Sequence, residues 1–150
     1  MLKRININSA EPEALKAMMA LETYLAQTSI PKTVKELIKI RSSQINGCAY
    51  CIDMHTKDAV KHGETSQRIF LLNAWRETNG IFTEEEKSAL AITEEVTLIH
   101  QNGLKDETYQ NAIQFFSENQ IAQIVMAVVT INAWNRIALS SHLQVGENFV

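Results

Sequence analysis

The amino-acid sequence predicts an all-α fold, and three observations lead to this conclusion. Apolar residues recur at helical spacing along most of the chain, and no segment alternates apolar and polar residues as a half-buried strand would. The linkers are short, and the 150 residues include only 5 glycines and 2 prolines. A chain of this length can bury a core of its own. We therefore predict one domain over residues 1–150, built from six or seven helices.

The N-terminal part of the chain is expected to contain an arm and two helices. Residues 1–10 show no helical pattern and are predicted to be extended. Residues 11–27 carry apolar positions at helical spacing after an acidic first turn, which predicts a helix. Pro31 suits the first turn of the next helix. That helix ends at Asn46-Gly47, a dipeptide that breaks the pattern.

Three further helices follow along the chain. The helix that begins at Cys48 is expected to stop at Gly63, because glycine favours helix C-termini. A second amphipathic helix is predicted over residues 66–78. Thr83 and the glutamate three residues later have the spacing of a capping box, which predicts a helix start there. This helix is expected to end near Gly103.

Two helices are expected in the C-terminal part of the chain. A short one begins at Asp106, and a second capping-box pattern, Ser117 with Gln120, begins a long apolar helix. The residues after about Leu139 form a tail without a clear period.

The long apolar helix has hydrophobic residues on more than one face, so it must be buried nearly all round. Burial inside the domain or pairing with a second copy would achieve this, and we favour a homo-oligomer. Asn132, Asn135 and Arg136 interrupt the helix, which argues against a membrane span of about 20 apolar residues. Buried polar groups need partners, so these residues predict an interhelical or intersubunit network.

Composition and charge exclude several function classes. The net charge of −3 offers no basic field for nucleic acid or anionic lipid. The first residues contain no apolar run that would act as a signal peptide. We therefore predict a cytoplasmic protein. A lone Cys-x-x-C pair in a reducing compartment points to redox or metal chemistry rather than to a structural crosslink.

Both cysteines lie at the predicted helix start, with a histidine four residues after the second. Unpaired N–H groups and the helix dipole favour a thiolate there, which is the reactive form of cysteine. On a helix, Cys48, Cys51 and His55 fall within an arc of about 60°. Cysteines at this spacing have Cα atoms about 5–6 Å apart, within disulfide range. His55 can accept a thiol proton directly or through one water.

Glu36 is placed near this group by a hairpin argument. If the helices before and after residues 46–47 pack antiparallel, residues equally far from the turn lie opposite each other. Glu36 is about 16 Å before the turn and His55 about 13 Å after it, at about 1.5 Å per residue. A carboxylate there would orient the imidazole and raise its basicity.

The two thiols are not equivalent. The helix dipole and exposure favour Cys48 as the more acidic thiol, whereas proximity to His55 favours Cys51. We favour Cys51, because a base one turn away should outweigh a screened dipole effect of about 0.3–1 kcal/mol. Two rival interpretations are simple packing of small apolar residues and a zinc site completed by Glu36 or His62. The zinc site lacks the second ligand pair that structural zinc usually has.

The pattern Glu36-x11-Cys48-x2-Cys51-x3-His55 resembles the motif of AhpD-like alkylhydroperoxidases, in the carboxymuconolactone decarboxylase-like superfamily. In helix layout the resemblance extends over most of the chain. It implies an AhpD-like domain in which Cys51 is the peroxidatic cysteine, Cys48 the resolving cysteine, His55 the base and Glu36 the end of a proton relay.

The resemblance also implies partners and an assembly. The substrate would be a hydroperoxide, and an external dithiol, either a thioredoxin-like protein or a dihydrolipoyl group, would reduce the disulfide without a metal or organic cofactor. The protein would form a trimer or hexamer.

One position departs from the best-studied type, because Tyr50 stands where that type has a second relay histidine, and a phenol is a poor base. Two alternative functions stay open for the chain as a whole: a non-catalytic redox sensor or adaptor, and a cofactor-free decarboxylase of a lactone acid, which would not need two cysteines.

Overall fold

The computed structural model describes residues 4–149, and within this range it contains eight α-helices, one 3₁₀ helix (η1) and no β-strand. The predicted all-α fold is confirmed. The elements are α1 (Ile7–Ala10), α2 (Pro12–Ala26), α3 (Lys32–Asn46), α4 (Ala49–Lys61), α5 (Ser66–Leu71), η1 (Leu72–Glu77), α6 (Glu84–Thr97), α7 (Asp106–Ala112) and α8 (Glu118–Ser141).

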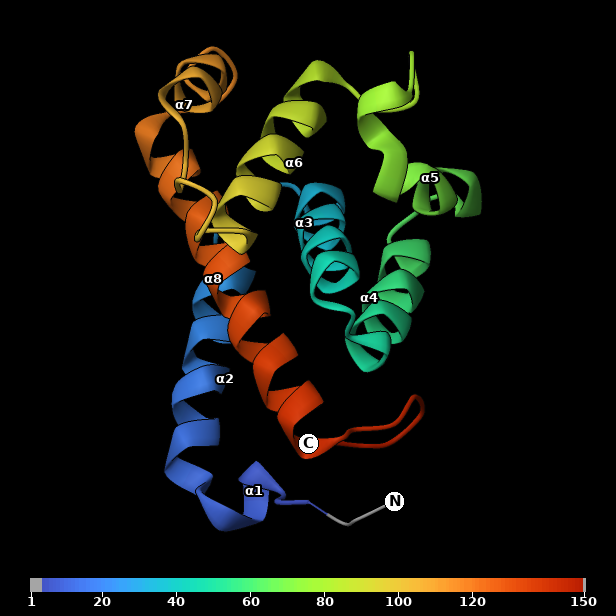
Figure 1. Ribbon diagram of the computed structural model, residues 1–150, viewed down its shortest axis with the longest axis vertical. Coiled ribbons are helices and arrows are strands. Elements are labelled where there is room, and N and C mark those ends of the chain that lie inside the picture. Colours follow the sequence, from blue (N-terminus) through green and yellow to red (C-terminus); the bar gives the residue numbers. More distant parts are fainter. Residues whose placement is uncertain (1–3, 150) are drawn as a thin grey trace.

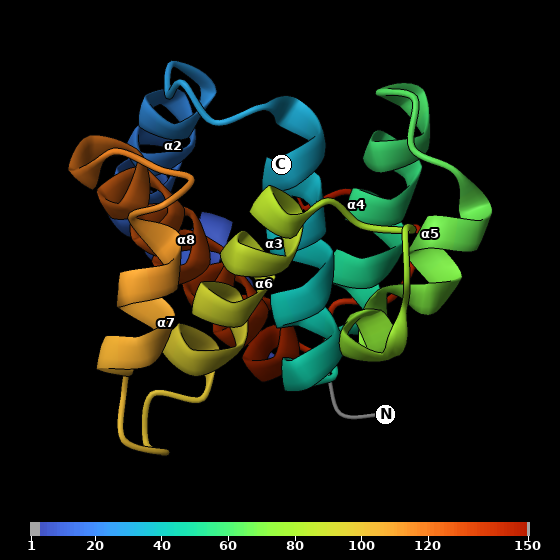
Figure 2. The same ribbon diagram turned by 90° about the horizontal axis from the view of Figure 1, so that it is seen from above.

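Helix α3 lies at the centre of the fold, with α4, α6 and α8 packed against it (Figures 1 and 2). Its apolar side chains are buried in two directions. Ile38 joins a hydrophobic cluster that also contains residues of α6 and α8. Leu37 and Ile40 join a second cluster with residues of α4, η1 and α6. Helix α8 likewise packs against several helices, namely α2, α3 and α6. The middle of the fold is therefore formed by α3 and α8.

The two predicted capping boxes begin α6 and α8, which confirms both helix starts. The Thr83 hydroxyl accepts a hydrogen bond from the Glu86 N–H at 3.1 Å, and the Glu86 carboxylate accepts one from the Thr83 N–H at 2.8 Å. Ser117 and Gln120 form the equivalent pair at 3.3 and 3.0 Å. These contacts join residues three apart, so the local sequence is enough to specify them.

The N-terminal arm is not extended throughout. Residues 7–10 form the short helix α1, which begins where the Asn6 side chain accepts a hydrogen bond from the Ser9 N–H at 3.2 Å. An Asn cap therefore accounts for the difference from the prediction. Residues 1–3 lie outside the described residues.

Three other element boundaries differ from the prediction. The helix expected over residues 66–78 changes to 3₁₀ geometry after Leu71, which separates α5 from η1, and within η1 the backbone leaves helical geometry at Ala74 (φ −117°). Helix α6 ends at Thr97 rather than near Gly103, since the intervening residues form turns with Asn102 at φ 74°. Helix α8 continues to Ser141, two residues beyond the predicted start of the tail.

Glu94 connects α3, η1 and α6. Its carboxylate accepts hydrogen bonds from Trp75 Nε1 at 2.9 Å, Arg76 Nη2 at 2.8 Å and Arg41 Nε at 2.8 Å. Burial alone would raise the pKa of Glu94, but the hydrogen bonds from Trp75, Arg76 and Arg41 outweigh it and hold the pKa below its usual value of 4.5.

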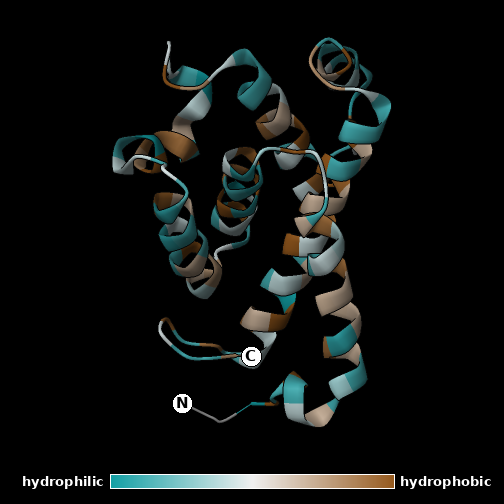
Figure 3. Ribbon diagram, turned by 180° about the vertical axis from the view of Figure 1, so that it is seen from behind, coloured by the Kyte–Doolittle hydropathy of each residue, from teal (hydrophilic) through white to brown (hydrophobic). Residues whose placement is uncertain are grey.

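Helix α8 is long and apolar enough to cross a membrane by length and composition, which is true of no other helix in residues 4–149. The structure places it against α2, α3 and α6, and hydrophobic residues recur along it (Figure 3). Ile124, Val128 and Ile131 are almost completely buried in this packing. We therefore interpret α8 as a core helix.

The polar residues of α8 form an interhelical network. Asn46 at the end of α3 donates to Asn132 Oδ1 at 3.0 Å and to Asn135 Oδ1 at 2.8 Å. Asn135 in turn donates to Ser43 Oγ, and Asn132 donates to Thr97 Oγ1, each at 3.0 Å. The predicted network is thus present within the chain for Asn132 and Asn135, whereas Arg136 is exposed and donates only to Asn132 of its own helix. The network joins α8 to the residues directly before the cysteine pair.

Candidate functional site

The turn between α3 and α4 places the cysteine pair. Gly47 ends α3 in the left-handed conformation (φ 71°), which glycine adopts without steric cost. Cys48 is the N-cap of α4, and its sulfur accepts a hydrogen bond from the Cys51 N–H at 3.3 Å. The pair therefore lies at the helix start as predicted, with Cys48 one position before the first turn.

Cys48 and Cys51 form a disulfide whose Cα atoms are 5.4 Å apart, within the predicted range. Each cysteine is only 1% exposed. Ile131 and Ala138 of α8 complete a small hydrophobic cluster around them. The sulfur pair is therefore almost completely shielded from bulk solvent.

The Glu36–His55 pairing predicted from the hairpin is present. Helices α3 and α4 pack together, and His55 Nδ1 lies 3.0 Å from Glu36 Oε2. Both residues are buried, at 7% and 6% exposure. Because an ionised carboxylate only accepts hydrogen bonds, the Nδ1 atom carries the hydrogen. The Nε2 atom is then the ring nitrogen that is free to accept a proton.

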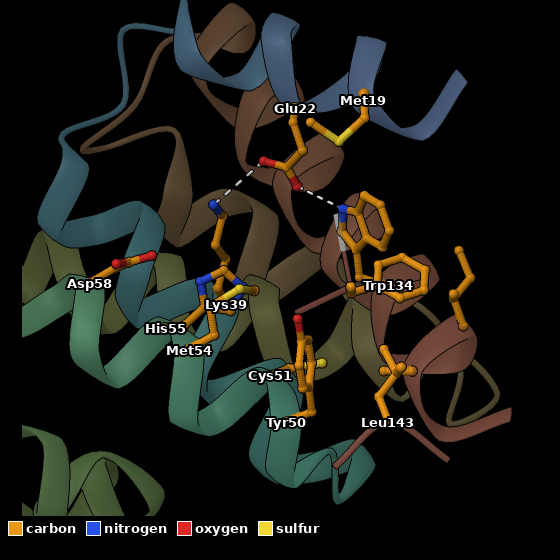
Figure 4. A pocket seen from close by; sticks show the side chains of 13 residues that line it. Met19, Glu22, Lys39, Tyr50, Cys51, Met54, His55, Asp58, Trp134 and Leu143 are labelled. Atoms are coloured by element: carbon orange, nitrogen blue, oxygen red, sulfur yellow. Dashed lines mark hydrogen bonds and ion pairs between the residues drawn. The ribbon is translucent and has the colours of Figure 1, made fainter. Parts of the chain in front are cut away.

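A charged group from α2 and α3 adjoins this pair, and sequence reasoning missed it. Lys39 Nζ lies 3.9 Å from Glu36 Oε1 and 3.7 Å from Glu22 Oε2. Glu22 also accepts a hydrogen bond from Trp134 Nε1 at 2.8 Å, so its two oxygens connect α3 with α8 (Figure 4). Lys39 could have been found from its position one turn after Glu36. Glu22 and Trp134 had no comparable signal.

A cavity of about 310 Å³, which we call the first cavity, lies against Cys51 and His55. Its walls come from α2, α3, α4, α8 and the C-terminal tail, and they are mostly apolar. Trp134 packs edge to face against Phe149 of the tail, with ring centroids 6.0 Å apart. Tyr50 also lines this cavity, so the phenol lies on its wall beside Cys51 (Figure 4).

No group of three or more His, Cys, Asp or Glu side chains in residues 4–149 is arranged to hold a metal ion. Both cysteine sulfurs are engaged in the disulfide, and His62 is the C-cap of α4, a helix length away from them. The arrangement offers instead a disulfide, a carboxylate-oriented imidazole and an apolar cavity.

Comparison with known proteins identifies the family. YdfG of Bacillus subtilis (strain 168), an uncharacterized protein, is 46% identical over 140 residues, which cover 93% of this chain and 95% of YdfG. The structure of ATU0492 from Agrobacterium tumefaciens matches 98% of this chain and 100% of its own, with a TM-score of 0.92 and 39% identity. ATU0492 is a protein of unknown function for which a role in antioxidant defence, as AhpD, has been suggested.

The fold also occurs in a debrominase. The debrominase Bmp8 matches 94% of this chain and 75% of its own, with a TM-score of 0.80 and 22% identity. A shared fold therefore does not by itself select the reaction. The model of the carboxymuconolactone decarboxylase family matches residues 12–95. The chain belongs to the carboxymuconolactone decarboxylase family, as an AhpD-like member.

Proposed function

We propose that this protein is a thiol-dependent peroxidase that reduces hydrogen peroxide or an organic hydroperoxide. Cys51 is the attacking cysteine, Cys48 resolves it, and the His55–Glu36 pair moves the proton. The observation that supports this is the buried hydrogen bond between Glu36 and His55 beside Cys51, on the wall of the first cavity. A base held by a carboxylate next to a thiol is the arrangement that nucleophilic catalysis needs.

The oxidative half-reaction begins when His55 Nε2 takes the proton of the Cys51 thiol. The thiolate attacks one peroxide oxygen, the O–O bond breaks, and the departing oxygen receives the proton from His55. It leaves as an alcohol, or as water from hydrogen peroxide, and Cys51 becomes a sulfenic acid. The Cys48 thiol then attacks the Cys51 sulfur, water leaves, and the disulfide forms. An external dithiol returns the two electrons that the peroxide has taken.

The first cavity favours organic hydroperoxides with an apolar body. Met19, Met54 and Trp134 contribute apolar surface, and burial of apolar surface contributes about 25 cal/mol per Å². Two carboxylates, Glu22 and Asp58, also line the cavity. Among the lining residues of the described part of the chain, Lys39 is the only lysine or arginine. An anionic substrate would therefore meet net repulsion.

The test is an assay of peroxide loss with excess dithiothreitol, combined with a count of free thiols. The wild-type protein should complete many turnovers, and Cys51→Ser should complete none. Cys48→Ser provides the matched control, because it keeps the attacking thiol and should form a sulfenic acid after a single peroxide equivalent. Unchanged dithiol-dependent peroxide loss in Cys51→Ser would refute the proposal.

Two rival functions give different results in the same experiments. A redox sensor or adaptor would lose two thiols to peroxide without turnover. A lactone decarboxylase would keep its activity on a lactone acid when both cysteines are replaced by serine.

The proposed assembly is a cytoplasmic homo-oligomer, a trimer or hexamer. An exposed apolar groove between α6 and α8 supports it, since Ile99 and Val129 line this groove and are 59% and 44% exposed. A second copy is the proposed occupant, because apolar patches of this kind are typical of subunit contacts. Light scattering should give a mass of three or six chains, and a monomer would contradict it.

A further inference from the structure

A second cavity, of about 260 Å³, borders Cys48. Cys48 lines this second cavity and Cys51 does not, whereas Cys51 lines the first cavity and Cys48 does not. Tyr50, Ala138 and Leu143 line both, so they form the wall between the two cavities. A molecule in the second cavity therefore meets Cys48 first, and a molecule in the first cavity meets Cys51 first.

His142 contributes an imidazole to the wall of the second cavity. It is the C-cap of α8, in the left-handed conformation (φ 54°), and lines the cavity together with Cys48. Its Nδ1 atom is buried and has no hydrogen-bond partner among residues 4–149. Buried polar atoms in folded proteins nearly always have a partner, and for Nδ1 this is a water molecule or a ligand. The imidazole is a possible base on the wall that Cys48 also lines, so it can take up the proton of an incoming thiol.

We propose that the second cavity is the entry site for the reducing thiol, which attacks Cys48 and expels Cys51 as a thiolate. This inference rests on the proposed redox function of the disulfide. Exchange is faster when the sulfur that leaves is the more acidic thiol. Attack at Cys48 makes Cys51, the cysteine beside His55, the leaving sulfur. Each reduction thereby regenerates the thiolate that the next peroxide needs.

The exchange takes place in two steps. The incoming thiol gives its proton to His142, and its sulfur forms a bond to Cys48 as the Cys48–Cys51 bond breaks. The second thiol of the reductant then attacks the reductant sulfur bound to Cys48. This closes the oxidised reductant as a disulfide and releases the Cys48 thiolate, which takes the proton back from His142. The second thiol's proton is left with the Cys51–His55 pair.

The two ends of the disulfide thus serve different molecules. Peroxide meets Cys51 in the first cavity, and the dithiol meets Cys48 in the second. Leu139, Leu143 and Val145 line the second cavity, so a dithiol with an apolar arm would bury that arm against them.

The first experiment maps the site of attack. The oxidised wild-type protein is mixed with the monothiol 2-mercaptoethanol, quenched with acid at the shortest accessible times and alkylated, and the peptide containing both cysteines is sequenced by mass spectrometry. Mercaptoethanol should be found on Cys48 and the alkyl group on Cys51, in at least tenfold excess over the reverse. Preferential attachment to Cys51 at the earliest times would overturn the proposal.

The second experiment fills the second cavity. Val145 is 56% exposed on its wall, and Val145→Trp should slow reduction of the disulfide by dithiothreitol about tenfold. Oxidation of the reduced protein by peroxide should change less than twofold. Val60→Trp is the matched control, since Val60 is 52% exposed on α4 and lines neither cavity. Equal slowing of both half-reactions by Val145→Trp would contradict a separate entry site.

The third experiment tests whether His142 accepts the thiol proton. His142→Asn keeps a residue that tolerates the left-handed conformation, and should slow reduction by dithiothreitol about 100-fold, the usual loss when a general base is removed. The fully ionised thiol 2-nitro-5-thiobenzoate has no proton to give, so its reaction should slow less than threefold. Equal losses with both thiols would exclude this role.

Failure of this inference differs from failure of the proposed function. All three experiments measure reduction of the isolated oxidised protein, and only the second adds a single oxidation by peroxide for comparison. A disulfide that resists every thiol would reject the redox function itself, whereas attack at Cys51 would reject only the assignment of the second cavity.

Discussion

Glu36→Gln removes the charge that orients His55 while keeping nearly the same side-chain volume. In the wild type, Glu36 Oε2 accepts the Nδ1–H of His55 at 3.0 Å, and neither residue is more than 7% exposed. A neutral amide in this place no longer stabilises the imidazolium formed when His55 takes a proton. It can also donate to Nδ1, which would move the ring hydrogen to Nε2, the atom that should act as the base.

The expected effect follows from the strength of such a hydrogen bond. A hydrogen bond to a charged group contributes about 1.5–3 kcal/mol, and each 1.36 kcal/mol of barrier corresponds to about tenfold in rate. The rate of Cys51 oxidation by peroxide should therefore fall about 10- to 150-fold. Because both groups are buried and water cannot replace the lost partner, we expect the upper part of this range.

The assay is stopped-flow oxidation of the reduced protein with limiting peroxide, followed through tryptophan fluorescence and checked by thiol counts. Glu64→Gln is the matched control. Glu64 is also a buried glutamate, but it pairs with Arg68, far along the chain from the cysteines. Both variants should lose stability, and only Glu36→Gln should lose rate. A loss below threefold in Glu36→Gln would refute the assigned role of the carboxylate.

Two predictions concern stability. Glu94→Gln should lower the melting temperature at pH 7 by about 2–10 °C, from about 1–3 kcal/mol of lost charged hydrogen bonding. Because the pKa of Glu94 is lowered in the folded state, this stabilisation is complete above about pH 4.5 and disappears as the pH falls through the folded-state pKa. Thermal melts of the two proteins should thus converge in acid, and a difference that does not depend on pH would contradict this. Asn135→Ala removes the hydrogen bonds that Asn135 makes with Ser43 and Asn46 and leaves space in a fully buried site, so it should cost about 2–4 kcal/mol in urea unfolding, whereas a cost below 1 kcal/mol would show that the network contributes little.

The sequence was sufficient to predict the structure where the contacts join residues that are close together along the chain. The capping boxes join residues three apart, and the Cys48–Cys51 distance follows from helix geometry. The Glu36–His55 contact was also predictable, because one short turn between two antiparallel helices fixes which residues lie opposite each other. In each case a known rise per residue or a fixed spacing replaces knowledge of the tertiary structure.

The remainder of the site depends on segments that are distant in sequence. Glu22, Trp134 and Phe149 meet at the first cavity only because α2 packs along α8 and the tail folds back over it. Periodicity cannot give the crossing of two helices or the path of a tail. The change from α5 to η1 after Leu71 was missed for the same reason, since tertiary packing can override helix propensity.

The polar network on α8 also determines the register of that helix. An apolar helix could slide one turn along its neighbours and still bury hydrophobic surface, so hydrophobic packing alone specifies its position weakly. Such a slide would separate Asn132 and Asn135 from Asn46, and each stranded buried group would cost about 1–3 kcal/mol. Trp134 lies between the two asparagines, and Asn46 lies two residues before Cys48. The same few hydrogen bonds that select one register for α8 therefore keep the cavity wall aligned with the disulfide.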